Sequence, residues 1–360
     1  MRNMRNMKRT GYVVILMAAV LLLSVVGCGT QTTAPTTTAP TTAPTASGGA
    51  AATQPITIKF SYAPPVNGFY GQIYDYLAKT VEEESKGQLK LQVYPGGTLV
   101  SDQQILDAVT QGNVDIGHFM VAYIDNTIKE LTPFEIPGAY PSSKFVELDK
   151  AARPGLNKVF NKYGLHYLGP VDIGFVTLAA NKKIGIPITA PEQMKGHTVR
   201  TAGKWNGEVI KLWGGSPVTI PMGDLPNALQ LGTIDISNTG FDLVTSLKLY
   251  EIAPNVTKTD LSGNFGGLIM NDKAWNKLNS DQQAALTRAA EKWVVFNHQL
   301  AVKSGNEFEN QVKKGGAKLA VLSPEQNADF RKASAQALEQ VKGISGSDGQ
   351  EFIKIFEGLK

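Results

Sequence analysis

The chain has 360 residues, of which 42% are hydrophobic, and its formal net charge at pH 7 is +4. Arg2, Arg5, Lys8 and Arg9 account for this whole excess, because the other basic and acidic residues balance. A neutral remainder has no electrostatic attraction to nucleic acid or to an anionic membrane surface, so we expect no nucleic-acid partner. The remaining length, about 300 residues, is large for one hydrophobic core and suits two lobes.

An apolar run over residues 13–26 follows the basic residues, and Gly27 places a small residue at its end. A basic start, a short apolar stretch and a small residue at the cut are the parts of a secretory signal peptide. We therefore predict a signal peptide over residues 1–27 and export from the cytoplasm. The alternative is an uncleaved membrane anchor, but the run is shorter than the ~20 residues that span a bilayer.

Cys28 is the only cysteine of the chain and comes directly after this signal. The string Val25-Val26-Gly27-Cys28 resembles a bacterial lipobox, which implies cleavage before Cys28 and lipidation of its thiol. Residues 28–54 are rich in Thr and Pro and contain no large apolar side chain, so we expect a disordered tether. The protein would then be held by lipid on the outer face of the cell membrane.

The first half of the folded part predicts alternating strands and helices. Apolar residues recur at every second position in the expected strands and at helical spacing between them, with Gly or Pro at the boundaries. The expected strands cover residues 56–62, 89–93 and 114–116, and the expected helices cover residues 70–81 and 105–109. This order requires parallel pairing with crossover helices, which is an α/β lobe.

The second half repeats the pattern, with a helix start at 189–192, strands at 198–200 and 218–220, and a helix at 208–213. Residues 108–116 and 228–236 echo one another, since each segment has a helix end, a glycine and then an apolar-Asp-apolar strand. Ser280 and Gln283 predict a capping box for a long helix over residues 281–314, which could cross both lobes. The string 323–326 predicts the start of another helix.

No catalytic or metal-binding motif is found in the sequence. The four histidines have no metal-ligand spacing, and neither a Gly-x-Ser-x-Gly motif nor a phosphate-binding loop is present. No nucleophile and base can be paired from the sequence. We therefore predict that the protein is not an enzyme and uses no cofactor or metal.

Several strings together resemble the solute-binding proteins of TRAP (tripartite ATP-independent periplasmic) transporters, the DctP-type family. They are Leu91-Gln92-Val93-Tyr94-Pro95-Gly96-Gly97-Thr98-Leu99, residues 105–109 and 112–117, Pro191-Glu192-Gln193-Met194-Lys195-Gly196-His197-Thr198-Val199-Arg200, residues 217–222, and residues 228–235. They occur in the family's order between residues 56 and 340.

The resemblance implies a fold like that of class II periplasmic binding proteins. Each lobe would have a mixed, mostly parallel sheet flanked by helices, and a long helix would be shared by both lobes. We expect lobe 1 to comprise residues 55–177 and 266–305, and lobe 2 to comprise residues 178–265 and 306–345. A monomer would bind a small organic acid in the cleft and deliver it to permease membrane subunits for ion-driven uptake.

Arg200 matches the family's carboxylate-clamping arginine. Its guanidinium offers a fork of donors that fits a carboxylate through two parallel hydrogen bonds, and it keeps its charge at any working pH. The local pattern places it at the end of a short strand, where ligands of α/β proteins bind. The alternative from pattern alone is an arginine in a structural ion pair.

The chain departs from the family pattern at three positions. Many relatives carry a second arginine where this chain has Val176, and Gly and Glu where it has Ile236 and Asn238. The site would therefore have one fewer cation and one fewer anion. We expect a monocarboxylate or amphipathic solute rather than a dicarboxylate.

Other candidate ligand-binding residues follow strand ends or match family positions near the ligand, although any single Met or aromatic residue could instead belong to the core. They are Asn67, Met120, Tyr123, Phe175, Trp205, Met222, Asn238 and Thr239. Alternative functions are a lipid-anchored receptor of an ATP-driven (ABC) importer, a signalling receptor, and an exported enzyme acting on carboxylates.

Overall fold

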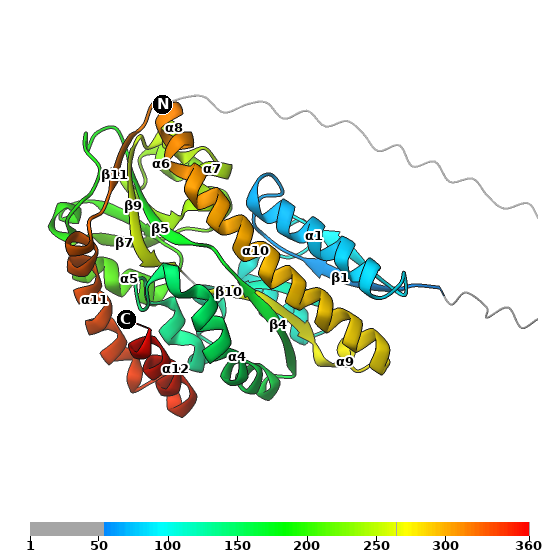
Figure 1. Cartoon of the computed structure of the whole chain (residues 1–360). Coiled ribbons are helices and arrows are strands. Elements are labelled where there is room, and N and C mark those ends of the chain that lie inside the picture. The colour runs from blue at the N-terminus through cyan, green and yellow to red at the C-terminus, as the bar shows by residue number, and fades with distance from the viewer. Residues whose placement is uncertain (1–53, 264, 360) are drawn as a thin grey trace, which may run out of the picture. The chain divides into compact units, whose positions relative to one another are not determined.

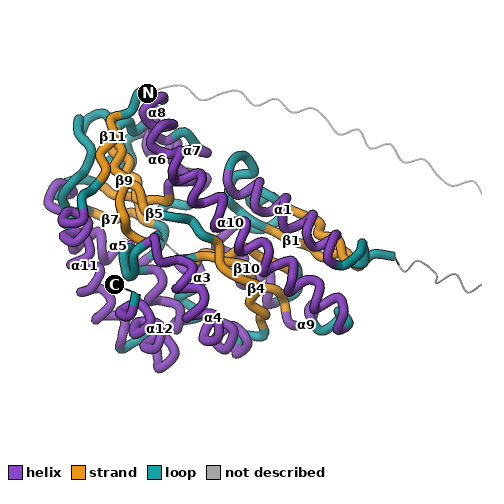
Figure 2. Tube along the Cα trace, in the orientation of Figure 1, coloured by secondary structure: helices purple, strands orange, loops and turns teal. Residues whose placement is uncertain are grey.

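The computed structural model describes residues 54–263 and 265–359. The predicted signal peptide, the predicted lipidation site Cys28 and almost all of the predicted tether lie outside these residues. Within the described ranges, no helix is both long and apolar enough to cross a membrane. The described residues form two β-sheets with helices packed around them (Figures 1 and 2).

The first sheet has five strands, and four of them run in the same direction while β10 is antiparallel to both of its neighbours. In order across the sheet, the strands are β2 (Leu89–Tyr94), β1 (Ile56–Ser61), β3 (Ile116–Met120), β10 (Gly266–Asn271) and β4 (Leu165–Val171). The first and third of the predicted early strands differ from expectation, because β1 ends at Ser61 and β3 begins at Ile116 and continues to Met120.

The second sheet has six strands and again contains a single antiparallel strand, β5, beside its parallel neighbours. Its strand order is β11 (Lys318–Val321), β9 (Asn255–Ser262), β5 (Phe175–Ala180), β8 (Ile236–Gly240), β6 (Thr198–Thr201) and β7 (Ser216–Thr219). The order β2-β1-β3-β10-β4 therefore has its counterpart in β7-β6-β8-β5-β9, and the expected mixed, mostly parallel sheets are confirmed.

The sequence echo corresponds to the same corner in both sheets. Asp115 precedes β3 and accepts the Lys59 backbone N–H at 2.8 Å, while Asp235 precedes β8 and accepts the Thr198 N–H at 3.0 Å. In each case the acceptor is a carboxylate oxygen and the donor lies in the parallel neighbouring strand. Lys59 belongs to β1, and Thr198 is the first residue of β6. A carboxylate that accepts a backbone N–H fixes where the next strand begins.

Helices cover the sheets in both halves. Their bounds are α1 (Phe69–Glu84), α2 (Ile105–Thr110), α3 (Val121–Ile124), α4 (Phe145–Lys162), α5 (Lys204–Leu212), α6 (Leu225–Leu231), α7 (Phe241–Ser246), α8 (Leu249–Ile252), α9 (Asp272–Trp275), α10 (Ser280–Lys314), α11 (Pro324–Lys342) and α12 (Gly346–Gly358). Short 3-10 turns are η1 (Asp102–Gln104), η2 (Lys129–Glu135), η3 (Ser142–Lys144), η4 (Pro191–Met194) and η5 (Met222–Asp224). The helix start expected at 189–192 is thus the single turn η4.

The long helix α10 passes both sheets, since it contacts β4 of the first sheet and β11 of the second (Figure 1). Its apolar inner face, predicted from the sequence, includes the fully buried Trp293. The capping box lies one residue earlier than predicted: Asn279 caps the helix, and the Asn279 N–H donates to Gln282 Oε1 at 3.0 Å. Gln283 instead donates to the Trp275 carbonyl oxygen.

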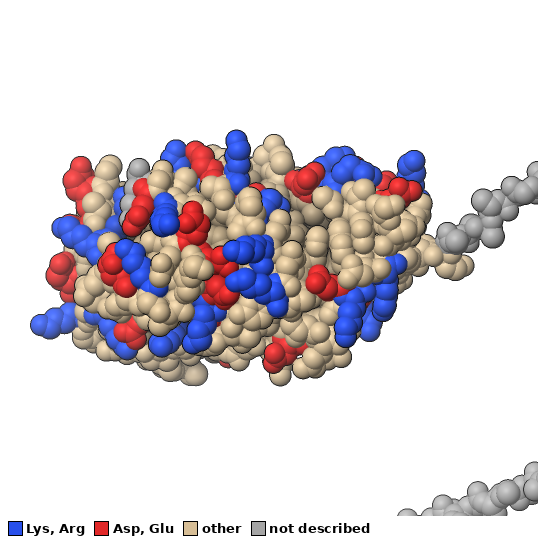
Figure 3. All heavy atoms as spheres, turned by 90° about the horizontal axis from the view of Figure 1, so that it is seen from below, with Lys and Arg blue, Asp and Glu red and all other residues tan. Residues whose placement is uncertain are grey.

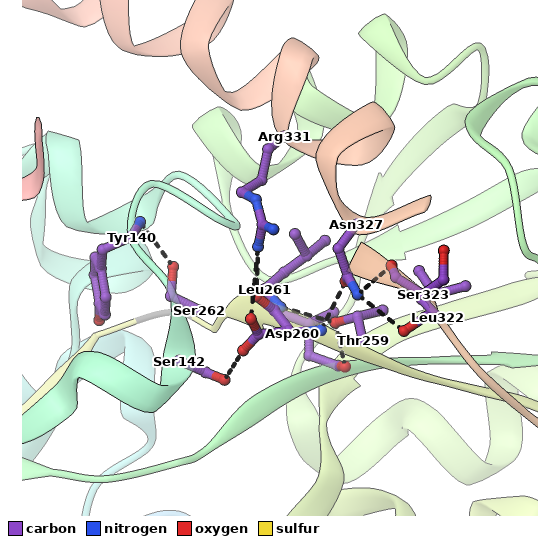
Figure 4. Close-up of polar contacts among 11 residues, drawn as sticks. Tyr140, Ser142, Thr259, Asp260, Leu261, Ser262, Leu322, Ser323, Asn327 and Arg331 are labelled. Carbon is purple, nitrogen blue, oxygen red and sulfur yellow. Dashed lines mark hydrogen bonds and ion pairs between the residues drawn. The ribbon is translucent and has the colours of Figure 1, made fainter. Parts of the chain in front are cut away.

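Two chain segments cross directly between the sheets, from β4 to β5 and from β9 to β10. The first crossing is tied to α10, because Asn297 accepts the Asp172 N–H at 2.8 Å and His298 Nδ1 lies 2.7 Å from Asp172 Oδ2. The end of β9 is fixed by other elements, as Figure 4 shows: Ser142 donates to the Asp260 carboxylate and Arg331 of α11 donates to its carbonyl oxygen. The crossings are therefore anchored at their ends.

The surface carries charges of both signs. On the face shown in Figure 3, Lys and Arg side chains are interspersed with Asp and Glu side chains among larger uncharged areas. Among the described residues, several exposed ion pairs form within one helix, such as Lys354 with Glu351 and Lys332 with Asp329. Exposed pairs of this kind contribute little to stability, because water and salt screen the two charges.

Candidate functional site

Arg200 lies in the short strand β6, which is followed by the start of α5. Arg200 is only 2% exposed, so its guanidinium is almost completely removed from solvent. Burial lowers the pKa of Arg200, while Tyr123 and Asp102 favour its charged form. An arginine keeps its proton in proteins, so a buried positive charge stands at this point of the fold.

The guanidinium is only partly satisfied by the protein. Arg200 Nε donates to the Ile220 carbonyl oxygen at 2.9 Å, and Nη1 donates to the Asn238 carbonyl oxygen at 3.3 Å. Nη2 is buried and has no hydrogen-bond partner among the described residues. Two backbone carbonyls therefore fix the side chain in one orientation and leave a donor free, which is costly unless a ligand accepts from it.

This free donor belongs to a pocket with a cavity volume of about 40 Å³. The wall is formed by both sheets, by the two crossings and by helix starts next to them. Its residues are Tyr70, Met120, Tyr123, Ile173, Val176, Arg200, Ala202, Asn206, Met222, Asn238, Thr239, Gly240, Asp242, Leu243 and Gly263. A concave site in which polar groups converge among apolar side chains is typical of small-molecule binding.

Tyr123 and Asp102 provide the electrostatic surroundings of Arg200. Burial raises the pKa of Tyr123 to about 12, with Arg200 opposing the shift and Asp102 adding to it. Burial also raises the pKa of Asp102, and Arg200 partly opposes this shift. The buried Tyr123 hydroxyl interacts with the side chains of Asp102 and Arg200 but forms no hydrogen bond of ordinary geometry with either, so it can also turn to a ligand.

Helix α5 is held at its start by an acid from the other half of the chain. The Asn206 backbone N–H, in the first turn of the helix, donates to Glu135 Oε1 at 3.0 Å. Burial raises the pKa of Glu135 well above its usual range, and the neighbouring Asp125 raises it further. Asn206 also accepts from Thr201 at 2.6 Å, so the segment directly after Arg200 is fixed by buried hydrogen bonds.

Six of the nine ligand-binding residues predicted from the sequence line this pocket: Arg200, Asn238, Thr239, Met120, Tyr123 and Met222. The other three do not. Asn67 is exposed in the loop before α1, and Trp205 is half-buried on α5 beneath Lys204. Phe175 packs against Phe241 and Phe308. No role in ligand binding is tested for any of the nine, so these assignments stay predictions.

Several pocket residues were missed, above all Tyr70, Asn206 and Asp242. The helical spacing of apolar residues predicted Tyr70 only as part of a helix face. Asn238 stands where many relatives carry Glu, and the carboxyl group in this pocket comes instead from Asp242. Its position two residues after a strand end was the available signal, because such positions in parallel sheets face the ligand side.

Among residues 54–263 and 265–359, no group of three or more His, Cys, Asp and Glu side chains is arranged to hold a metal ion. His118 is buried in the first sheet, where burial lowers its pKa to about 3. It therefore remains neutral at ordinary pH and belongs to the core.

Two sheets joined by short crossings, with a buried pocket between them, define a two-lobed binding protein. Residues 60–343 match the family described as "Bacterial extracellular solute-binding protein, family 7", DctP. The chain therefore belongs to the DctP family of solute-binding proteins, and its relatives in this family are extracytoplasmic receptors of TRAP transporters.

Individual relatives resemble this chain over most of their length. The ectoine-binding periplasmic protein TeaA of Halomonas elongata is 24% identical and covers 80% of this chain and 86% of its own. The C4-dicarboxylate-binding protein DctB of Bacillus subtilis is 23% identical, covering 81% and 84%. The sugar acid binding protein DctPAm of Advenella mimigardefordensis, solved with galactonate, shares the fold with a TM-score of 0.77, 21% identity, and coverage of 85% and 99%.

Proposed function

We propose that this protein is an extracytoplasmic receptor that binds a small organic acid through Arg200 and delivers it to a TRAP permease. The observation that carries the proposal is the buried, unpartnered Nη2 of Arg200 in the pocket between the two sheets. A ligand carboxylate would accept from Nη2 and remove the cost of an unpaired buried donor. Relatives are described as binding C4-dicarboxylates, galactonate or ectoine, which all carry a carboxylate.

The solute is proposed to be a monocarboxylate or an amphipathic acid. Val176 lines the pocket where many relatives carry a second arginine, and its neighbours Met120, Met222 and Ile173 are apolar. A second carboxylate would enter this pocket without a second cation, which is unfavourable in a buried site. Binding of a dicarboxylate more tightly than every monocarboxylate of similar size would contradict this part.

Closure of two lobes around the solute is the proposed working cycle. The lobes would comprise residues 55–177 with 266–305, and residues 178–265 with 306–345, and they would move about the crossings from β4 to β5 and from β9 to β10. A solute that contacts both lobes stabilises the closed state by its additional contacts. The closed surface would be recognised by the permease, and no bond of the solute would be made or broken.

Lipidation at Cys28 is the proposed means of attachment to the membrane, and residues 28–54 are the proposed tether. The support is the sequence pattern of a signal peptide that ends in Gly27-Cys28. Mass spectrometry of the mature protein from its native membrane should find a diacylglyceryl group at an N-terminal Cys28, and Cys28→Ser should abolish it. An unmodified mature start elsewhere would contradict the proposal.

The binding proposal is tested by a thermal-shift screen of small organic acids, since a ligand that binds only the folded state raises the melting temperature. Acids that raise it are then measured by calorimetry with wild type and Arg200→Ala. We expect at least one carboxylate to bind wild type and to lose its affinity in the variant. Equal affinity for both proteins would contradict the role of Arg200.

A further inference from the structure

We infer that Asp242 is a second ligand-binding group of the pocket, and that the solute carries a protonated nitrogen in addition to its carboxylate. This inference rests on the proposed function, because it assumes that Arg200 binds the carboxylate. It goes further by assigning the other end of the solute.

Asp242 lies in the first turn of α7, two residues after β8 ends at Gly240. It lines the same pocket as Arg200 and is only 3% exposed. Its Oδ2 atom is buried and has no hydrogen-bond partner among the described residues. The pocket therefore contains an unpartnered donor, Arg200 Nη2, and an unpartnered carboxyl oxygen, Asp242 Oδ2.

The backbone around Asp242 leaves room for its carboxyl group. Gly240 has no side chain, and a Cβ atom there would lie 2.3 Å from Asp242 Oδ1. Any other residue at position 240 would therefore displace the acid. A glycine at this point keeps the carboxyl group in the wall of the pocket.

The two unpartnered groups favour a solute with complementary ends. A plain monocarboxylate would satisfy Arg200 but would leave the Asp242 oxygen buried and unpaired, which costs free energy. A dicarboxylate would place a second negative charge near an acid. A carboxylate that also bears a protonated nitrogen pairs with both groups and leaves no charge unbalanced in the pocket.

The surroundings of Asp242 agree with this role. Burial raises the pKa of Asp242 to about 7, while hydrogen bonding to its carboxyl group from the backbone N–H groups of Asp242 and Leu243 and from the Tyr70 side chain opposes the shift. The nearest groups on α1 are thus tyrosines rather than cations, and Tyr70 itself has a pKa raised by burial and by Asp242. Since none of these groups supplies a positive charge, a ligand cation is the group that would stabilise the ionised acid.

The test compares pairs of ligands that have nearly the same shape. In each pair an ammonium carboxylate is matched with the acid in which a methyl group replaces the ammonium: β-alanine with butanoate, 4-aminobutanoate with pentanoate, and 5-aminopentanoate with hexanoate. In two cyclic pairs, a ring CH2 group replaces the protonated ring nitrogen: proline is matched with cyclopentanecarboxylate, and pipecolate with cyclohexanecarboxylate. Calorimetry on wild type should find at least one pair whose nitrogen-containing member binds about tenfold tighter or more.

Asp242→Asn and Arg200→Ala then separate this inference from the proposed function. In Asp242→Asn, which keeps the shape of the side chain, the preference for the nitrogen-containing member should fall to about threefold or less, while both members still depend on Arg200. If the member without nitrogen binds wild type equally or more tightly in every pair, the role of Asp242 is overturned and that of Arg200 stands. If Arg200→Ala binds as well as wild type, the proposed function fails. If neither member of any pair binds wild type, the proposed roles of Arg200 and of Asp242 are both contradicted. If Asp242→Asn does not fold, the comparison of the paired ligands on wild type still tests the role of Asp242.

Discussion

The backbone N–H of Asn206 donates to Glu135 Oε1 at 3.0 Å, so an acid from the first half of the chain caps the helix that follows Arg200. Glu135 is completely buried, and a Cβ added at Gly203 would lie 2.5 Å from its Oε1. Glu135 can approach the start of α5 this closely because Gly203, the residue directly before the helix, has no side chain. The position of Arg200 is thus supported by a residue more than sixty positions away in the sequence.

Glu135→Ala should destabilise the protein by about 1 to 3 kcal/mol, because it leaves the Asn206 N–H buried without an acceptor. Glu135→Gln keeps an acceptor, and because burial and Asp125 hold the pKa of Glu135 high, the neutral amide resembles the native group. Its cost should be smaller. Urea denaturation measures both, and Glu351→Ala, at an exposed side chain, serves as the surface control. An unchanged midpoint for Glu135→Ala would contradict the capping role.

The stability of the ligand-free protein should fall as the pH rises from about 4 to about 7, in part because of Asp242. Its folded pKa of about 7 lies above the unfolded value, so the folded state holds a proton that the unfolded state has lost. The effect is up to about 4 kcal/mol for a shift of this size. Asp242→Asn should reduce the loss, whereas Asp329→Asn, at an exposed position, should not.

Guanidinium unfolding at pH 5 and pH 8 measures this difference for wild type and both variants. The account requires the wild-type difference between the two pH values to exceed that of Asp242→Asn. An identical pH dependence in the two proteins would show that Asp242 is not buried in its neutral form.

His298 should titrate above the usual value of about 6.5, because it lies 2.7 Å from Asp172, whose carboxylate raises its pKa. The stabilisation from this pair is present below pH 6.5 and is lost as the pH rises through the folded pKa. Asp172→Asn should lower the pKa of His298. Proton NMR of the ring signals measures it, with His166 as the internal comparison, since burial lowers the pKa of His166. A lower pKa for His298 than for His166 would contradict the pairing.

The alternating strands and helices of both halves could be predicted from the sequence because their signals are local. Ile58 and Phe60 alternate with exposed residues in β1, and Ser323 and Gln326 cap α11 as their spacing indicates. Errors arose where neighbouring residues offer the same chemistry. Asn279 and Ser280 are both good caps, and only the structure shows that Asn279 accepts the N–H of Gln282.

The pocket was less predictable than the fold. Arg200 ends the string of residues 191–200, and Asn238 follows the echo segment 228–236, so both could be placed at strands from the sequence. Both line the pocket. Tyr70 and Asp242 come from helices whose periodicity predicts only burial, so their meeting in one pocket depends on how the sheets pack. Phe175 shows the converse: an aromatic residue at a strand start was expected in the cleft, but it packs against Phe241 and Phe308.

The most direct test is calorimetry of one bound organic acid with wild type, Arg200→Lys and Arg200→Ala. The account predicts that Arg200→Ala binds at least about a hundredfold more weakly, and that Arg200→Lys recovers only part of the affinity, because an ammonium cannot form two parallel bonds to a carboxylate. Tyr250→Phe, outside the pocket, should bind like wild type. Unchanged affinity in Arg200→Ala, with the variant folded, would contradict the central claim that this buried guanidinium holds the ligand carboxylate.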